Sequence, residues 1–341
     1  MKIYNYILAS ALLMSVAACS SDDDMLSPYD GDPNAVRIQP QISGIVVSRT
    51  TPQDDKSTSF SSGDEIRVGK VVSDDVVDFY PYTFNGANWS PTNKMTDLKP
   101  YLRWENGETE MTLQAYYPIE VSKDQYVDIN EDLTATMNDF KLPTIQNGVD
   151  KIAKADYMSF SGNVTKGDNN SVSFAMQRHT ARVCVSINGF GDQYNSSKTQ
   201  CDVKIYSPYE NIKVTYSDKI TASGQGNSPI LVTPYNGTGL KLTDETNNGG
   251  TAIALVTPSA QAMNDKTFIE VTVRVKVGEG ETASENEKTL YVKGIPAFQG
   301  GYSYTYNLHV GKDVVNVGSV TVKPWSEPIV VNGGIAEENA E

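Results

Sequence analysis

The stretch SVSFAMQRHTARVCVSI, residues 171–187, alternates apolar and polar side chains along most of its length. The apolar positions fall on one side of an extended chain, first at Val172, Phe174 and Met176, and then at Val183, Val185 and Ile187. A period of two is typical of β-strands that bury one face and expose the other. The stretch therefore predicts two strands in succession.

The same alternation recurs outward from this stretch. It is clearest in FIEVTVRVKV (268–277) and YSYTYNLHV (302–310), and shorter around Ile212, Val214 and Tyr216. Turn-type clusters such as NGAN, ENGE, KGDNN, YNGTG and TNNGG separate these runs, whereas capped helical periodicity is hard to find. These patterns predict an all-β protein built from two Greek-key β-sandwiches.

The chain length fits two domains of ordinary size. Removing residues 1–18 from the 341 residues leaves 323, enough for two separate cores. We place the boundary in TKGDNN (165–170), which gives an N-terminal sandwich over 36–168 and a C-terminal sandwich over 169–335. Residues 19–35, rich in Ser, Asp and Pro, are expected to form a flexible tether, and residues 336–341 a tail.

The first eighteen residues have the features of a secretory signal peptide. Lys2 precedes an apolar run over 7–14, which is too short to cross a bilayer. Val16-Ala17-Ala18-Cys19 fits a lipobox, so we expect cleavage between Ala18 and Cys19 and attachment of diacylglyceryl and palmitate at Cys19. The alternative is an ordinary secreted protein whose first mature residue is a cysteine.

The run SSDDD (20–24) follows the lipobox directly. Its like charges and lack of apolar residues are typical of a solvated, disordered spacer. The run also resembles the signal that sends lipoproteins of some Gram-negative anaerobes to the outer face of the outer membrane. We therefore expect a surface-exposed protein held to the outer membrane through lipid at Cys19.

The charge balance argues against nucleic-acid binding. The chain has 28 Lys and Arg against 42 Asp and Glu, a net charge of −14, and an isoelectric point near 4.7. A phosphate-binding face needs clustered cations, and the Lys and Arg residues do not cluster. The acidic surface is expected to serve solubility.

Two cysteines remain once Cys19 is acylated. Cys184 and Cys201 flank the loop NGFGDQYNSSKTQ and could close it as a disulfide, or could be two isolated buried thiols. Two cysteines without nearby histidines do not form a zinc site, and no metal or other cofactor is expected.

Catalytic signatures are also lacking. The only histidines, His179 and His309, lie on strand patterns among apolar neighbours, without a nucleophile motif beside them. No G-x-S-x-G, H-E-x-x-H, phosphate-binding or calcium loop occurs. We predict that the protein is not an enzyme.

Aromatic residues are frequent in the first half, and two interpretations are open for them. They could form a platform that stacks sugar rings, or they could belong to the core. Phe84 and Trp89 straddle a turn and would pack across a hairpin, which favours the core. The residues concerned are Tyr80, Tyr82, Phe84, Trp89, Trp104, Tyr116 and Tyr117.

The order of several short motifs resembles that of a known family. The motifs are TSFSSGDEIRV (58–68), YTFNGANW (82–89), LQAYYP (113–118), KADYMSFSG (154–162), SVSFAMQRHTARVCVSI (171–187), IALVTP (253–258) and GGYSYTYNLHV…GSVTVKPW (300–325). Together with the lipobox, they are similar to the fimbrillin-like (Mfa-like) proteins of type V pili. The resemblance covers nearly the whole mature chain.

The resemblance implies two transthyretin-like β-sandwich domains and transport to the cell surface as a lipoprotein. It also implies that, in polymerising subunits, an Arg-specific protease removes the tether with the first strand. A donor strand from the C-terminal segment of a neighbouring subunit then fills the gap. The implied partners are other pilus subunits, the outer membrane, and a ligand on a host or bacterial surface.

The segment AVRIQPQISGIVVSRT (35–50) has the pattern of such a first strand. Its alternating apolar positions are Val36, Ile38, Ile42 and Val46. Pro40 has no N–H to donate, so an edge position in the sheet is expected.

Arg49 is the expected maturation site. It precedes the polar run TTPQDDKSTS, so cleavage between Arg49 and Thr50 would free everything N-terminal to it. The vacated edge would then be a template for strand addition. Alternatively, Arg49 is a surface residue after a permanent first strand; Arg37 is a weaker candidate because it lies inside the strand pattern.

The C-terminal segment SEPIVVNGG (326–334) carries the apolar run Ile329, Val330 and Val331. This run is either a donor strand for a neighbour or the last strand of its own domain. The leading prediction is a structural or adhesive pilus subunit (stalk, tip or anchor). The alternative is a surface glycan-binding lipoprotein of a nutrient-uptake system.

Overall fold

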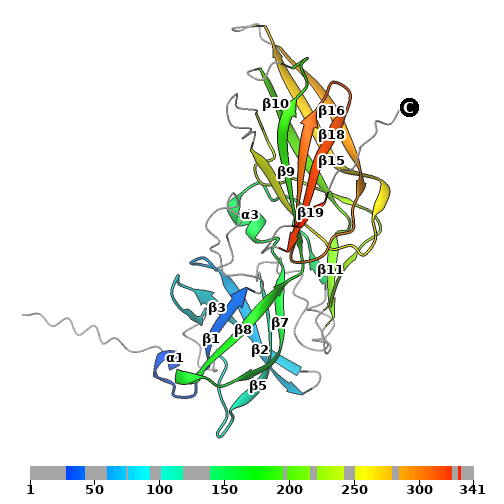
Figure 1. The fold of residues 1–341 in the computed structure, drawn as a ribbon. Coiled ribbons are helices and arrows are strands. Elements are labelled where there is room, and N and C mark those ends of the chain that lie inside the picture. Colours follow the sequence, from blue (N-terminus) through cyan, green and yellow to red (C-terminus); the bar gives the residue numbers. More distant parts are fainter. Residues whose placement is uncertain are drawn as a thin grey trace, which may run out of the picture.

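The fold is all-β, as the sequence predicts (Figure 1). The computed structural model describes residues 28–42, 60–73, 76–92, 101–117, 139–194, 198–215, 221–241, 250–278, 284–324 and 329–331. No helix among these residues is long and apolar enough to cross a membrane.

A seven-stranded sheet occupies the lower part of Figure 1. Its order is β1 (Arg37–Ile42), β8 (Ser171–Arg178), β7 (Met158–Thr165), β5 (Glu110–Tyr117), β2 (Glu65–Ser73), β3 (Val76–Phe84) and β4 (Trp89–Pro91). Neighbouring strands are antiparallel except β1 and β8, which are parallel. The two end strands, β1 and β4, also contact each other, so the sheet curls back on itself.

The inner face of this curled sheet carries one buried cluster, here called the N-terminal cluster. Its fully buried members include Ile66, Val68, Tyr82, Leu113, Met158 and Met176. Alternation places them there: in β8, for example, every second residue is buried. The cluster holds the first half of the chain together.

Three further sheets form the upper part of Figure 1. The four-stranded sheet runs β13 (Ile230–Val232), β10 (Thr199–Ser207), β15 (Met263–Val277), β16 (Ser284–Ile295). The five-stranded sheet runs β14 (Thr251–Val256), β9 (Ala181–Phe190), β17 (Tyr302–Val310), β18 (Val315–Pro324), β19 (Ile329–Val331). The three-stranded sheet runs β12 (Thr221–Gln225), β11 (Asn211–Thr215), β6 (Asp139–Lys141).

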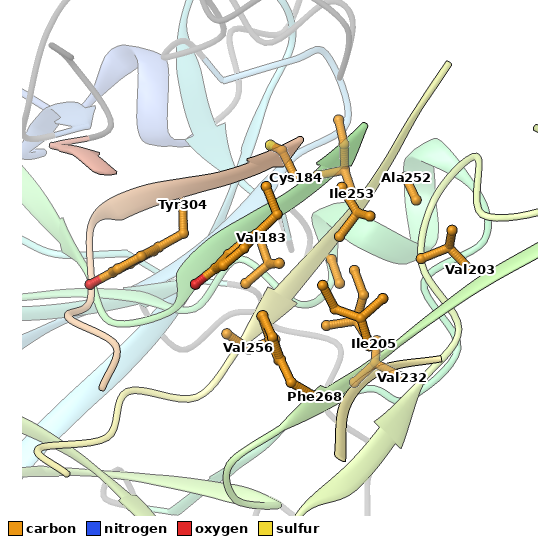
Figure 2. Close-up of a cluster of buried hydrophobic side chains, with 14 of the residues drawn as sticks. Val183, Cys184, Val203, Ile205, Val232, Ala252, Ile253, Val256, Phe268 and Tyr304 are labelled. Atoms are coloured by element: carbon orange, nitrogen blue, oxygen red, sulfur yellow. The ribbon is translucent and has the colours of Figure 1, made fainter. Parts of the chain in front are cut away.

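These sheets enclose a second buried cluster, the C-terminal cluster (Figure 2). Val183 comes from β9, Ile205 from β10, Ile253 from β14 and Phe268 from β15, all at most 3% exposed. The ring of Phe268 meets Tyr306 edge-on, with centroids 5.0 Å apart. Side chains from the four- and five-stranded sheets thus form one core, as in a β-sandwich.

The sheets do not divide where the sequence suggested a domain boundary. The expected boundary at 168/169 falls between β7 and β8, which pair in one sheet. Side chains of β8 belong to the N-terminal cluster, and the change of sheet falls at His179 and Thr180, between β8 and β9. Conversely, two residues that precede the expected boundary pack into the C-terminal cluster: Phe140 of β6 and Ile152 of α3 (Val149–Ala153).

The expected tether also ends earlier than the composition suggested. Residues 28–35 are part of the fold: α1 (Pro28–Gly31) carries Tyr29, which is 3% exposed, and Ala35 is fully buried. A short 3-10 turn, η1 (Asp168–Asn170), precedes β8. Both elements lie at the start of the β1–β8 pair.

Candidate functional site: the first strand and its slot

Residues 28–42, comprising α1 and β1, form the candidate site together with the surface that receives them. We call residues 28–42 the plug. We call the receiving surface, made by β8 and residues 101–104, the slot. In Figure 1, β1 lies beside β8.

The plug supplies most of the strand pairing of β8. β1 and β8 pair from Arg37 opposite Ser171 to Ile42 opposite Met176. On its other side β8 pairs with β7 only at Gln177 and Arg178. Among the described residues, the backbone over 171–176 therefore has β1 as its strand partner.

Side chains of β1 alternate between the core and solvent. Ile38 and Ile42 are 3% and 7% exposed, and Pro40 between them is also buried. Gln39 and Gln41 face solvent. Val36 is fully buried, so three of the four apolar residues expected to share a face, Val36, Ile38 and Ile42, do so. Burying each isoleucine is worth about 1.5–3 kcal/mol.

Tyr29 fastens the start of the plug. Its hydroxyl donates to the carbonyl of Val36 at 3.1 Å, and its ring meets Tyr82 and Tyr101 edge-on at 6.4 and 5.1 Å between centroids. The guanidinium of Arg37 lies 4.1 Å from the centre of the Tyr29 ring and donates to the Tyr29 carbonyl at 2.9 Å. Arg37, the weaker cleavage candidate, thus contributes to the packing of the plug.

Asp32 fastens the plug to the slot through its carboxylate. Arg103 approaches it with Nε 2.8 Å from Oδ2 and Nη2 3.2 Å from Oδ1. The Tyr101 hydroxyl donates to Oδ2 at 3.2 Å. Burial, followed by the charge of Asp32, raises the pKa of Tyr101, so this hydroxyl keeps its proton and remains a donor.

Backbone hydrogen bonds continue this attachment. Val36 N–H donates to the Leu102 carbonyl at 3.0 Å, and Trp104 N–H donates to the Asn34 carbonyl at 2.9 Å. Asn170 Nδ2 donates to the Pro33 carbonyl at 2.6 Å. The plug is therefore held along its whole length.

Sequence reasoning found the buried face of β1 but missed the contacts of Tyr29, Asp32 and Arg103. An aromatic residue inside the supposed tether, PYDGDPNAV, was a usable signal, because tethers rarely carry buried aromatics. Nothing in the local sequence around Arg103 indicates its role. The predicted residues Ala18, Cys19, Val46, Arg49 and Thr50 lie outside the described residues.

The C-terminal apolar run pairs with its own chain. β19 is antiparallel to β18, with Ile329 opposite Val322 and Val331 opposite Val320. This is the arrangement of a last strand, one of the two alternatives for the run. The pairing covers only three residue pairs.

The two internal cysteines are buried free thiols. Cys184 lies on β9 and Cys201 on β10, strands of different sheets. Neither sulfur is bonded to another, so this structure has the second alternative, two separate buried thiols. Burial raises the pKa of Cys201 to about 12, so its thiol stays protonated.

His179 is a buried structural residue, as predicted. Its Nε2 lies 2.6 Å from Ser159 Oγ, and burial lowers its pKa to about 4 against an opposing effect of Asp156. Asp156 accepts from Arg178 Nε at 3.0 and 3.1 Å. Ser159, His179 and Asp156 are at most 4% exposed, as is typical of structural residues in the core. In the described part of the chain, no three His, Cys, Asp or Glu residues gather as a metal site.

The aromatic residues of the first half belong to the core. Tyr82, Trp89, Trp104, Tyr116 and Tyr117 are at most 8% exposed. Tyr80 and Phe84 are partly buried against the N-terminal cluster. These side chains do not present an open platform for sugar rings.

The fold and the plug define a β-sandwich protein whose N-terminal strand completes one sheet. Residues 48–325 match the fimbrillin-like family, and the chain belongs to that family. It is 25% identical over 184 residues to a Bacteroides ovatus protein named "Putative fimbrium tip subunit Fim1C". That match covers 52% of this chain but only 33% of the relative's length.

Solved structures with a similar fold include two described as a "putative cell adhesion protein". One is from Bacteroides uniformis (TM-score 0.53, 18% identity), and the match covers 86% of this chain and all of the other. The second is from Bacteroides ovatus (TM-score 0.53, 16% identity), with 90% and 98% covered. These likenesses show the fold, and membership of the family supports a role in a fimbrium at the cell surface.

Proposed function

We propose that the protein is a structural or adhesive subunit of a type V pilus that joins its neighbours by donor-strand complementation in the slot. The observation that carries this proposal is the pairing of β8: residues 171–176 depend on β1, a strand near the N-terminus. Cleavage between Arg49 and Thr50 would leave the plug bound only by non-covalent contacts. A strand from a neighbouring subunit could then take its place.

The C-terminal run is the proposed donor. Ile329, Val330 and Val331 pair with β18 at only three positions, so they can leave their own sheet at a small cost in hydrogen bonds. Attachment of lipid at Cys19 would carry the precursor to the outer membrane. Cleavage at Arg49 would release the folded body from that anchor, whereas an uncleaved chain would remain an anchor.

A reversible lock on the plug tests this proposal. Gln39 and Ser173 face each other across the β1–β8 pair, and Ser173 Oγ donates to Gln39 Oε1 at 3.1 Å. Paired strands lie about 4.8 Å apart, within the range that a disulfide bridges. A Gln39→Cys/Ser173→Cys variant should therefore join plug and slot covalently when oxidised.

The assay follows polymer formation after treatment with an Arg-specific protease. The oxidised double variant should stay monomeric, and reduction should restore polymers. The Gln39→Cys single variant, which cannot form the lock, should polymerise under both conditions. Equal polymerisation of the oxidised and reduced double variant would show that assembly does not use the slot.

Two further measurements address the ends of the chain. Deletion of residues 326–341 should abolish polymers while leaving the subunit folded, and surviving polymers would rule out this segment as donor. Mass spectrometry of the surface protein should find either a new N-terminus at Thr50, as a polymerising subunit requires, or an acylated Cys19, as an anchor requires.

A further inference from the structure

We propose that the outer face of the four-stranded sheet binds a neutral oligosaccharide whose sugars carry methyl groups, in an acetamido substituent or at C6 of a 6-deoxy ring. This face lies in the upper part of Figure 1, whereas the slot lies on β8 in the lower part. The inference goes beyond the proposed mode of assembly and does not depend on it. We call this surface the tyrosine face; its residues are Ile145, Lys204, Tyr206, Leu231, Glu270 and Tyr291.

Exposed apolar side chains gather at the tyrosine face. Among the residues that the structure describes, five large apolar side chains are exposed, and four of them lie at or beside this face. Ile145, Leu231 and Tyr291 are 57%, 36% and 49% exposed, and Val149, four residues after Ile145, is 50% exposed. The fifth, Val277, is the last residue of β15. Apolar groups that gather in one exposed place mark a binding surface, whereas scattered ones need no explanation.

Strand pairing sets the polar and aromatic residues of the face side by side. Leu231 of β13 lies opposite Tyr206 of β10. Lys204 of β10 lies opposite Glu270 of β15, which in turn lies opposite Tyr291 of β16. The five side chains therefore share one surface across four strands.

The surface faces outward and is broad. Val203 and Ile205, which alternate with Lys204 and Tyr206 along β10, are buried in the C-terminal cluster. Ile145 extends the surface because it bridges to Thr233, two residues after Leu231. With about 4.8 Å between neighbouring strands, Ile145 and Tyr291 lie about 19 Å apart, so the face accommodates several sugar rings.

The charged groups on this side of the sheet are paired with each other. Lys204 Nζ lies 3.4 Å from Glu270 Oε1, and the two side chains are 44% and 15% exposed. Farther along the same strands, Arg274 forms an ion pair with Asp202. The face therefore offers no excess charge to an ionic ligand, and the net charge of −14 repels acidic glycans. This balance fits a neutral ligand.

Tyrosine rings beside hydrogen-bonding groups fit the two sides of a sugar. The C–H face of a sugar ring packs on an aromatic ring, and its hydroxyls bind polar groups at the rim. Burial, followed by the charge of Glu270, raises the pKa of Tyr206, so its hydroxyl remains a donor. The hydroxyls of Thr272 and Thr289, 3.2 Å apart, lie in the row next to Glu270 and Tyr291.

The aliphatic residues of the face add a requirement for methyl groups. A sugar hydroxyl placed against Leu231 or Ile145 would lose its hydrogen bonds to water without gaining others. A methyl group there gains from burial, by about fourfold in affinity. An acetamido group and a 6-deoxy ring both present such a methyl on a neutral sugar.

Titrations by saturation-transfer NMR on the mature chain test the proposal with two pairs of sugars. Chitotriose carries acetamido groups, and cellotriose has the same linkage with hydroxyls in their place. The trisaccharide 2′-fucosyllactose carries a 6-deoxy ring, and lactose lacks it. In at least one pair, the methyl-bearing sugar should bind about fourfold more tightly, and that pair identifies the source of the methyl.

Three variants locate the binding. Tyr291→Ala should weaken binding of the methyl-bearing sugar about tenfold. Leu231→Ser should reduce its preference over the matched sugar. Val277→Ala is the control, because Val277 is also exposed but lies outside the face, and it should leave every affinity unchanged. All three residues are exposed, and melting temperatures check that the variants stay folded.

Lack of saturable binding of both methyl-bearing sugars overturns the proposal, and so does equal affinity within both pairs. An unchanged affinity in Tyr291→Ala overturns the assignment to this face. Dimers in analytical ultracentrifugation that Tyr291→Ala abolishes would assign the face to a second copy of the chain instead. None of these results affects assembly through the slot, which the cysteine lock tests separately.

Discussion

Ile38→Ala tests how strongly β1 is held in the slot. Ile38 is 3% exposed and lies opposite Val172 of β8, with its side chain in the N-terminal cluster. Truncating a buried isoleucine to alanine typically costs about 2–5 kcal/mol, as lost burial plus a residual cavity. An edge strand can relax more easily than a central one, so we expect about 3 kcal/mol, towards the lower half of that range.

Urea unfolding followed by tryptophan fluorescence measures this loss, because Trp89 and Trp104 are buried in the same cluster. With a urea dependence of about 2–3 kcal/mol per molar, the midpoint should fall by about 1 M. Gln41→Ala is the matched control: the residue lies on the same strand but faces solvent, so its change should stay within about 0.5 kcal/mol. An unchanged midpoint for Ile38→Ala, or an equal loss for Gln41→Ala, would refute the packing described for β1.

Three further changes probe the region where β8 leads into β9. Burial lowers the pKa of His179 from 6.5 to about 4, so the unfolded chain binds a proton there more readily than the folded chain. The free energy of unfolding should therefore decrease as the pH falls from about 6.5 to about 4. In urea titrations at several pH values, His179→Gln should lack this part of the pH dependence. Asp156→Asn removes the carboxylate that accepts from the buried Arg178 guanidinium and should cost about 3–5 kcal/mol in the same assay, whereas an effect below 1 kcal/mol would contradict the buried ion pair. Gly300→Ala places a Cβ 2.7 Å from the His179 carbonyl oxygen and should lower the melting temperature. The control Gly31→Ala, whose Cβ meets nothing within 4 Å, should leave the melting temperature unchanged. Equal melting temperatures of the two variants would show that the backbones of residues 179 and 300 do not lie this close.

Local alternation predicted strands β1, β8, β9, β11, β15 and β17 and most of their buried faces, but it did not mark short strands such as β6, β12 and β13. Val172, Phe174 and Met176 are buried as the period of two requires, and so is the apolar face of β1. The reason is physical: in a sheet with one covered face, a shift of one residue would move every apolar side chain into water. The structural role of His179 followed from the same pattern.

Pairing over long distances in the chain could not be predicted in this way. Gln39 and Ser173 are hydrogen-bonded although 134 positions separate them. Nothing in the sequence around either residue specifies that their two strands pair in parallel. For the same reason, composition misplaced the boundary between the sheets: the turn-rich TKGDNN links two strands of one sheet, whereas the change of sheet at His179 and Thr180 has no turn signal. The forked contact of Arg103 with Asp32 likewise depends on tertiary structure alone.

The direct passage from β8 into β9 has a mechanical consequence. Only His179 and Thr180 separate the two strands, and both are at most 1% exposed. If a neighbouring subunit occupies the slot, tension on its strand loads the hydrogen bonds to β8 along the strand axis. The load then reaches β9, which lies between β14 and β17 inside the five-stranded sheet, without crossing a slack linker. A fibre built from such subunits would transmit force through its two sheets in series, and it would resist extension at the junction between them.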